Sequence, residues 1–207
     1  MKPAEKQIPE SPSMSEDLVL RQEENCVVTL TLNRPKQFNA LSEAMLTNLQ
    51  QELDSIANNE TLRLVILQGA GKVFCAGHDL KEMIANRKEE YYQTLFLQCS
   101  KMMMTLNQMP QPIIAKVHGI ATAAGCQLVA ACDLAVAAEG TQFATSGINV
   151  GLFCSTPAVP VSRNISRKRA MELLLTGDFI DADKALNWGL LNRVAPLDKL
   201  AEETQKL

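Results

Sequence analysis

Residues Ile113 to Gln127 read IIAKVHGIATAAGCQ, an apolar run that passes into a glycine-rich turn and then opens a helix. The apolar residues over 113–117 predict a buried strand, and the small residues that follow let another molecule approach the backbone closely. The start of a helix carries N–H groups without intrahelical partners and the positive end of the helix dipole. This stretch therefore predicts a strand, a turn and a helix that together stabilise negative charge without a cationic side chain.

A second turn of this kind lies upstream, where residues Phe74 to Leu80 read FCAGHDL. It follows a strand predicted over 64–68, and it precedes a short helix predicted over 79–86. Asp79 is suited to cap this helix, because aspartate at that position accepts hydrogen bonds from free N–H groups of the first turn. Two turns with this placement predict the two halves of an oxyanion hole.

Helix and strand patterns alternate along the rest of the chain. Leu46, Leu49, Leu53 and Ile56 recur at helical spacing after Ser42, a residue that can cap their helix. Further helices are predicted over 91–108, 125–132, 167–176 and 181–188. Further strands are predicted over 26–32, 134–137 and 191–194, and an irregular stretch over 143–154. This alternation predicts an α/β fold with largely parallel strands.

The domain organisation is expected to be simple. Residues 1–17 are rich in Pro, Glu, Ser and Lys, which predicts a disordered tail. Residues 18–196 are expected to form one domain. Residues 197–207 predict the start of a C-terminal helical region that is incomplete, with an apolar side through Leu200 that nothing later in the chain covers.

Composition argues against several classes of protein. The 207 residues include 20 Lys and Arg against 23 Asp and Glu, so no basic field for nucleic acid is expected. No apolar run reaches the roughly 20 residues that a membrane span requires, so we expect no membrane partner. The six cysteines include no C-x-x-C pair, which predicts reduced, buried thiols and no metal site. A cytoplasmic location is expected.

Three further stretches accompany the two turns: Leu32-Asn33-Arg34-Pro35 with Asn39-Ala40-Leu41, Cys132-Asp133-Leu134-Ala135, and Thr176-Gly177 with Ala185 to Leu190. In this order the chain resembles the crotonase, or enoyl-CoA hydratase/isomerase, superfamily. The resemblance implies a crotonase-like spiral of ββα units with helices covering the sheets, and a homotrimer or dimer of trimers. It also implies an acyl-CoA thioester as substrate or ligand, with no other cofactor.

The resemblance implies roles for individual residues. The backbone N–H groups of Ala76 and Ala124 are expected to donate to the thioester oxygen. Contacts with coenzyme A are expected from the following residues: Arg34, Lys36, Gln37, Asn39, Ala40, Leu41, Ala76, Gly77, His78 and Asp79. Arg34 and Lys36 have an alternative reading as solvated turn charges.

The chain departs from the hydratase pattern at both catalytic glutamates. Gln127 and Gly147 stand at these positions, and neither an amide nor a glycine takes a proton near neutral pH. Gly147 is expected to leave a space that a water, a substrate carboxylate or a bound small anion fills. His78 and His118 flank the two turns, and either is able to face the site or to serve structure alone. The chain is thus predicted to stabilise a thioester enolate without being an efficient hydratase; the alternative is a non-catalytic acyl-CoA-binding or assembly subunit.

Overall fold

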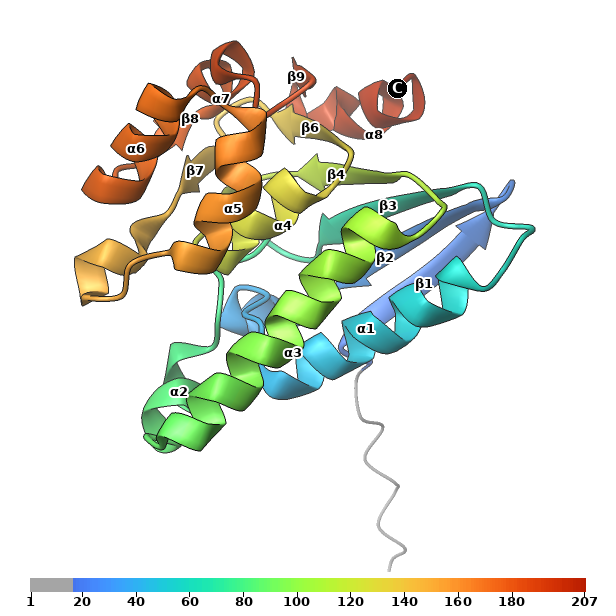
Figure 1. Ribbon diagram of the computed structural model, residues 1–207. Coiled ribbons are helices and arrows are strands. Elements are labelled where there is room, and N and C mark those ends of the chain that lie inside the picture. Colours follow the sequence, from blue (N-terminus) through green and yellow to red (C-terminus); the bar gives the residue numbers. More distant parts are fainter. Residues whose placement is uncertain (1–16) are drawn as a thin grey trace, which may run out of the picture.

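The computed structural model describes residues 17–207, so only Asp17 of the predicted tail lies among the described residues. A six-stranded sheet in the order β1-β2-β3-β4-β6-β9 crosses the molecule (Figure 1). Its pairs are parallel except for β1 with β2, which confirms the predicted α/β class. The strands are β1 (Val19–Glu24), β2 (Val27–Leu32), β3 (Leu64–Gly69), β4 (Ile113–Val117), β6 (Leu134–Ala138) and β9 (Arg193–Ala195).

A second, smaller sheet contains β5 (Ile120–Thr122), β7 (Gln142–Ala144) and β8 (Ile180–Asp181), in that order. The chain runs from β4 directly into β5 and from β6 directly into β7, so each passage contributes one strand to each sheet. Helices follow both passages, which is the predicted repetition of ββα units. The sequence patterns did not predict these three strands, because two or three residues are too few to show a period of two.

Eight helices and three short 3₁₀ turns surround the two sheets in the described part of the chain. In Figure 1, α1 and α3 lie side by side across one face of the main sheet. The helices are α1 (Glu43–Ala57), α2 (Leu80–Ala85), α3 (Glu89–Gln108), α4 (Ala124–Ala131), α5 (Ser155–Asn164), α6 (Arg167–Thr176), α7 (Ala182–Trp188) and α8 (Leu200–Gln205). The 3₁₀ turns are η1 (Pro35–Gln37), η2 (Ser146–Val150) and η3 (Leu197–Lys199).

Helix α1 forms as its pattern predicts. The Ser42 hydroxyl accepts a hydrogen bond from the Met45 N–H at 3.1 Å, and the four periodic apolar residues are almost completely buried. Helix α5 was not predicted. It carries Pro157 in its first turn and Pro160 in its interior, and proline normally argues against a helix because it lacks the N–H donor.

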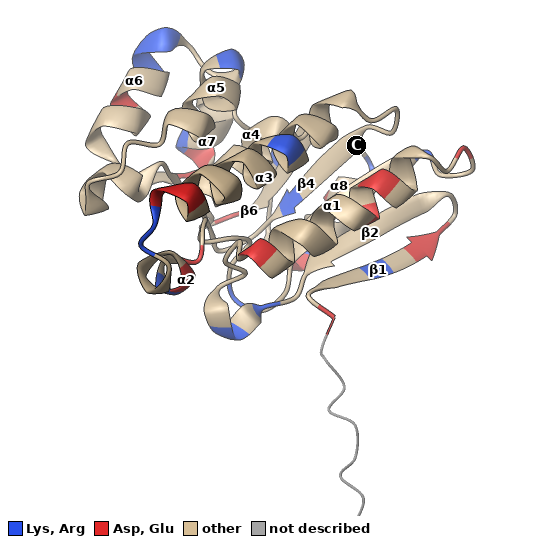
Figure 2. Cartoon of the chain, turned by 60° about the horizontal axis from the view of Figure 1, so that its bottom comes forward, with Lys and Arg blue, Asp and Glu red and all other residues tan. Residues whose placement is uncertain are grey.

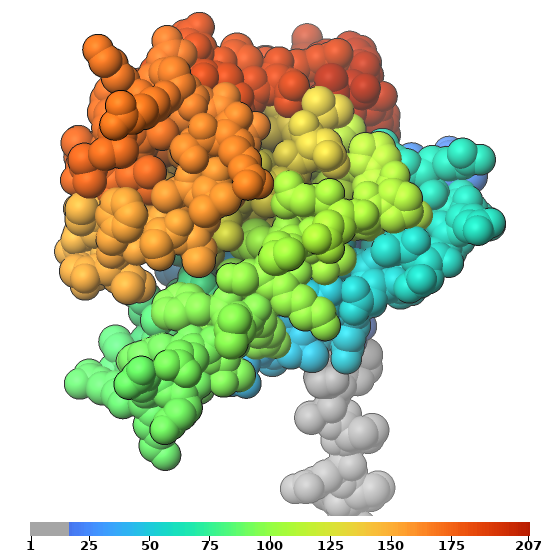
Figure 3. All heavy atoms as spheres, in the orientation of Figure 1, coloured from blue at the N-terminus to red at the C-terminus, as the bar shows by residue number. Residues whose placement is uncertain are grey.

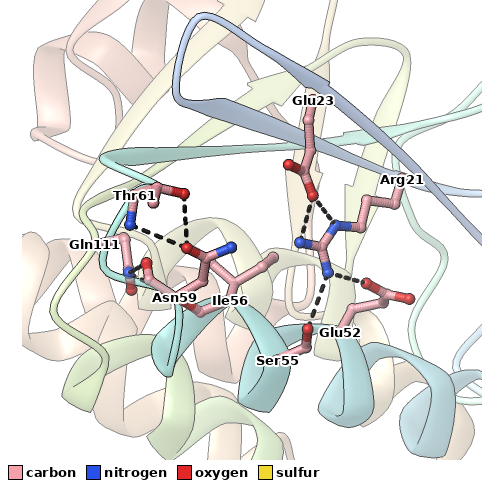
Figure 4. Close-up of polar contacts among 8 residues, drawn as sticks. All are labelled: Arg21, Glu23, Glu52, Ser55, Ile56, Asn59, Thr61 and Gln111. Atoms are coloured by element: carbon pink, nitrogen blue, oxygen red, sulfur yellow. Dashed lines mark hydrogen bonds and ion pairs between the residues drawn. The ribbon is translucent and has the colours of Figure 1, made fainter.

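Strand β1 was also not predicted, because its sequence VLRQEE is mostly polar. Figure 4 shows how one of its side chains attaches it to α1. The Arg21 guanidinium donates to the Glu52 carboxylate at 3.0 Å and to the Ser55 hydroxyl at 3.1 Å. In the same view the Gln111 amide donates to the Ile56 carbonyl at 3.0 Å and ties the start of β4 to the end of α1.

The C-terminal helix corrects one expectation. Leu200 is only 4% exposed and packs with Ile114, Val136 and Ala138, because α8 folds back onto the face of the sheet that β4 and β6 present. The apolar side of this helix is thus covered from within the chain. In Figure 2 the positions of Lys and Arg and those of Asp and Glu are both spread along the ribbon, in keeping with a formal net charge of −3.

Candidate functional site

A cavity of about 290 Å³ lies where the two predicted turns meet. Figure 3 shows the surface hollowed between α2, in green, and the segment around η2, in gold. The volume lies near the lower end of the range for small-molecule sites. Most of the lining is apolar, and the described residues that form it include no Asp, Glu, Lys or Arg: Ala76, His78, Leu80, Met83, Phe96, Ala123, Ala124, Ser146, Gly147, Val150, Leu152, Phe153, Cys154, Ser155, Thr156 and Pro157.

Backbone contacts hold the two turns together. The Thr122 N–H donates to the Cys75 carbonyl at 3.0 Å. Gly125 packs on the same carbonyl so closely that a Cβ there would lie 2.1 Å from its oxygen. A Cβ on Gly77 would lie 3.2 Å from the Ala124 nitrogen, and its φ of +91° also favours glycine. The predicted juxtaposition of the turns is therefore present, and glycines permit it.

Ala124 is the first residue of α4, and its N–H has no acceptor among the described residues. The preceding residue, Ala123, has φ +51° and ψ −121°, a conformation that glycine adopts more easily than alanine. Its N–H donates to the Ala144 carbonyl at 2.9 Å, which holds it in place. Ala124 lines the cavity, so this turn places its unpaired N–H beside the cavity.

Ala76 also lines the cavity, but its N–H is engaged. It donates to the Phe38 carbonyl at 3.1 Å. Phe38 and Asn39 both have φ of +52°, and this left-handed turn brings the carbonyl to Ala76. The expectation that the Ala76 N–H is free for a ligand thus differs from the structure, because a distant loop supplies its acceptor.

The N–H of His78 is free instead. Leu41 forms backbone hydrogen bonds with the two residues that flank His78. The Leu41 N–H donates to the Gly77 carbonyl at 2.8 Å, and the Leu41 carbonyl accepts from the Asp79 N–H at 3.2 Å. In a parallel bridge of this kind the central residue's own N–H and carbonyl point away from the partner strand. The His78 N–H accordingly has no acceptor among the described residues.

His78 is one of the residues that line the same cavity. Its ring meets Phe96 edge-on at a centroid distance of 5.3 Å, and both ring nitrogens are buried without a partner in the described chain. Burial lowers the pKa of His78, because the charged imidazolium loses its water. The imidazole is thus neutral at pH 7, with one donor and one acceptor nitrogen.

We expect acid to destabilise the protein through His78. The unfolded chain protonates this residue at about pH 6.5, whereas the folded protein resists protonation. The contribution of His78 to the free energy of unfolding is therefore fully present above pH 6.5. It is lost as the pH falls toward the lowered pKa, with a slope of at most about 1.4 kcal/mol per pH unit. Urea unfolding at pH 7.5, 6.5 and 5.5 measures this loss, and His78→Leu should flatten the profile. An unchanged profile in the variant contradicts the assignment.

Gln127 does not line this cavity. It lies 4% exposed in the wall of a second cavity of about 460 Å³ between α3, α4 and α5, and its side-chain oxygen has no partner among the described residues. Thr156 lines both cavities and stands between them. Gln127 is thus a neighbour of the two turns rather than a member of the cavity wall that they form.

Gly147 lines the first cavity but does not leave the expected space. A Cβ there would lie 2.4 Å from the Leu152 carbonyl oxygen and 2.8 Å from the Cys154 sulfur. The segment that closes back after η2 fills the position, and the Leu152 N–H donates to the Gly147 carbonyl at 2.9 Å. A glutamate at 147 would therefore require this segment to move.

Arg34 and Asp79 form a half-buried ion pair at 3.0 Å, and Arg34 also donates to the Ala40 carbonyl at 2.8 Å. Asp79 caps α2 as predicted, accepting from the N–H groups of Lys81 and Glu82. Burial raises the pKa of Asp79, but the Glu82 N–H and the Arg34 guanidinium outweigh it, so the pKa is lowered overall. Arg34 is thus a structural partner rather than a solvated turn charge.

The remaining residues of the predicted coenzyme A loop divide into two groups. Asn39 is fully buried, and its amide donates to the carbonyls of Ala70, Val73 and Phe74. Ala40, Leu41 and Gly77 are buried as well. Lys36 and Gln37 are exposed, beside Phe38, a 57%-exposed aromatic residue that sequence analysis did not single out.

The family model for enoyl-CoA hydratase/isomerase matches residues 22–207, nearly the whole chain. The chain belongs to the enoyl-CoA hydratase/isomerase family. Mitochondrial enoyl-CoA hydratase domain-containing protein 3 from rat is 44% identical over 96% of this chain and 66% of its own length. The human protein of that name is 48% identical over 86% of this chain and 59% of its own length. The chain thus spans two thirds or less of these relatives.

Solved structures of family members agree with the fold. A crystal structure of an enoyl-CoA hydratase from Mycobacterium smegmatis has a TM-score of 0.91 and 56% identity, covering 92% of this chain and 75% of that one. The human domain-containing protein 3 has a TM-score of 0.88 and 46% identity, covering 91% and 75%. These confirm the predicted crotonase fold and the likeness to the domain-containing protein 3 group.

The structure and the named relatives bear on the expected membrane partner and on the expected compartment. Among residues 17–207, no helix is both long and apolar enough to cross a bilayer. The names of the relatives from rat and human include "mitochondrial", so they do not support the cytoplasmic location, which stays a prediction.

The structure does not present the cysteine thiols or His118 as reactive groups. Five of the six cysteines are buried as predicted, whereas Cys26 is exposed on the turn between β1 and β2. Burial raises the pKa of Cys126 to about 12 and also raises that of Cys154, so neither is a thiolate at neutral pH. The His118 ring lies 2.9 Å from the Gly71 carbonyl and holds a loop outside the cavity.

We expect Ala123→Gly to stabilise this family member. Glycine relieves the strained conformation at φ +51°, although it also raises the entropy of the unfolded chain, so the net gain is about 1 kcal/mol. Urea denaturation measures it. The neighbouring Ala124→Gly, at a helical position, is the control and should have the opposite sign. Equal losses of stability in Ala123→Gly and Ala124→Gly would show that the backbone of Ala123 is not strained.

Proposed function

We propose that this chain binds an acyl-CoA thioester with its carbonyl oxygen between the N–H groups of His78 and Ala124. The observation that carries the proposal is the pair of N–H groups that have no acceptor within residues 17–207, on two turns in contact beside one mostly apolar cavity. Two such donors stabilise an oxygen on which negative charge develops. This pair replaces the Ala76 and Ala124 pair, because the Ala76 N–H already serves the Phe38 carbonyl.

The two donors polarise the bound thioester, and they would stabilise the enolate that forms when a base removes a proton from the α-carbon. Hydration by two carboxylates is not part of the proposal, because no Asp or Glu stands in the described cavity wall. Isomerase, lyase or thioester hydrolase chemistry fits an enolate or a polarised thioester, and we propose no cofactor besides coenzyme A. The exposed Lys36, Gln37 and Phe38 are proposed to meet the coenzyme A moiety at the mouth of the site.

A second candidate is a non-catalytic acyl-CoA-binding or assembly subunit. The same absence of a carboxylate from the described cavity wall favours it, together with the raised pKa of the nearby Cys154 thiol. Under this function the two N–H groups give affinity alone. A homotrimer or a dimer of trimers is proposed for either function, and light scattering during gel filtration measures its mass.

Binding of two matched ligands tests the proposed site. Butyryl-CoA carries the thioester oxygen, whereas its thioether analogue S-butyl-CoA lacks it. Two hydrogen bonds of ordinary strength predict about tenfold tighter binding of butyryl-CoA by calorimetry. Equal affinities would overturn the oxyanion site. Sustained turnover in a panel of acyl-CoA thioesters would support the enzyme, and tight binding without product would support the binding subunit.

A further inference from the structure

The first and second cavities lie end to end along the same helices. In Figure 1, α3, α4 and α5 lie next to one another. On α3, Phe96 lines the first cavity, and the second is lined by Ser100, Met103, Met104 and Asn107. On α4, Ala124 lines the first cavity, and the second is lined by Gln127, Ala130 and Ala131. Residues three or four positions apart share one face of a helix, so each helix presents one continuous stripe to both cavities.

Helix α5 repeats this pattern and contains the residue at the junction. Its residues in the wall of the second cavity are Thr156, Val159, Pro160, Arg163 and Asn164. Thr156 begins this stripe and, alone among the described residues, also lines the first cavity. Side chains on a helix tilt toward its N-terminus, and α5 begins at Ser155, which lines the first cavity. The half-buried Thr156 side chain therefore stands where the two cavities adjoin.

We propose that Thr156 sets the length of acyl chain that the protein accepts, by closing a channel that the two cavities would otherwise form. The inference rests on the proposed function and deepens it. With the thioester oxygen at the N–H of Ala124, the first residue of α4, the acyl chain runs along the stripe of that helix toward Thr156. A chain that ends within the first cavity fits, and a longer one meets Thr156.

Other polar side chains near the junction do not close it. Ser155 lines the first cavity alone, whereas Ser100 and Gln127 line the second alone. Removing one of these side chains would widen one cavity without joining it to the other. Thr156 is the position at which a smaller side chain would join the two.

The second cavity is suited to an alkyl chain once it is joined to the first. Its apolar wall consists of Met103, Met104, Ala130, Ala131, Val159 and Pro160. The amides of Asn107 and Asn164 and the carboxylate of Asp133 bond to backbone groups at 2.9 Å, 2.9 Å and 2.8 Å. Helix α5 advances about 10 Å between Thr156 and Arg163, so the cavity has room for several methylene groups.

Calorimetry with hexanoyl-CoA and decanoyl-CoA tests the inference. Each methylene that enters an apolar cavity tightens binding about fourfold. We expect the wild-type protein to bind decanoyl-CoA no more tightly than hexanoyl-CoA, and Thr156→Ala to bind decanoyl-CoA at least about tenfold more tightly. Equal affinities in Thr156→Ala, or a tenfold preference for decanoyl-CoA already in the wild type, would overturn the role of Thr156 and leave the proposed function intact. Failure of hexanoyl-CoA to bind the wild type would overturn both.

Further variants separate the passage of the chain from an effect on folding. Thr156→Val keeps the shape of threonine and should keep the wild-type ratio of affinities. Thr47→Ala is the matched control, because Thr47 lies exposed on α1 outside both cavities, and it should also keep that ratio.

Ala130→Leu fills part of the second cavity. Added to Thr156→Ala, it should remove the gain for decanoyl-CoA while hexanoyl-CoA still binds. A gain that persists in this double variant, or that Thr156→Val or Thr47→Ala also shows, would overturn the inference.

Discussion

Gly125→Ala is expected to separate the two turns and to abolish acyl-CoA binding. The new Cβ would lie 2.1 Å from the Cys75 carbonyl oxygen and 2.8 Å from its carbon, so backbone rather than a flexible side chain would have to move. Overpacking of this kind costs about 3 kcal/mol. Urea denaturation measures the loss of stability, and calorimetry with butyryl-CoA measures the loss of binding.

Gly140→Ala is the matched control for this substitution. Gly140 has φ +76° but nothing lies within 4 Å of an added Cβ, so the variant suffers backbone strain without a clash. We expect a loss of about 1 kcal/mol and unchanged binding of butyryl-CoA. If Gly125→Ala is no less stable than Gly140→Ala and still binds the thioester, the close packing of the turns does not form the site.

Ala124→Pro is expected to remove one oxyanion donor with little damage to the helix. Ala124 is the first residue of α4, a position that tolerates proline because its N–H has no intrahelical partner. For any acyl-CoA thioester that the wild-type protein converts, kcat/KM should fall about 10²- to 10³-fold. Steady-state kinetics measures this fall, and the preference for butyryl-CoA over S-butyl-CoA should disappear as well.

Ala124→Gly keeps the N–H and serves as the control for the proline variant. It should retain the preference for the thioester over the thioether, and circular dichroism should show folded protein for both variants. If Ala124→Pro is folded and keeps that preference, the Ala124 N–H does not bind the thioester oxygen. The same comparison in His78→Leu preserves both backbone donors and should leave the preference in place.

Strong periodic patterns and cap residues were sufficient to predict most of the large elements. The apolar spacing after Ser42 predicted α1, and Asp79 and Asp181 cap α2 and α7 as their sequence contexts indicate. The strands of the small sheet escaped prediction because they are too short to show a period. Strand β1 escaped because polar side chains such as Arg21 are satisfied by partners on α1, which lies far away in sequence.

The site was predicted in part. Both turns and their small residues were evident from the sequence, because glycine between a predicted strand and a predicted helix permits a tight turn with close backbone approach. The choice between Ala76 and His78 as donor depends on the Phe38 carbonyl, which a left-handed turn brings to Ala76 from more than thirty residues away. The space expected at Gly147 depends on the return of Leu152 and Cys154, which no local pattern specifies.

By itself the sequence determined the α/β class, the family and the two turns that meet at the site, because these follow from local patterns and from residues in a fixed order. The tertiary structure decided which N–H groups are free, which cavity Gln127 enters and what fills the position beside Gly147. It also left the ring nitrogens of His78 buried and without a partner among the described residues. Each of these depends on hydrogen bonds and packing between segments distant in sequence, so it exists only once the chain has folded.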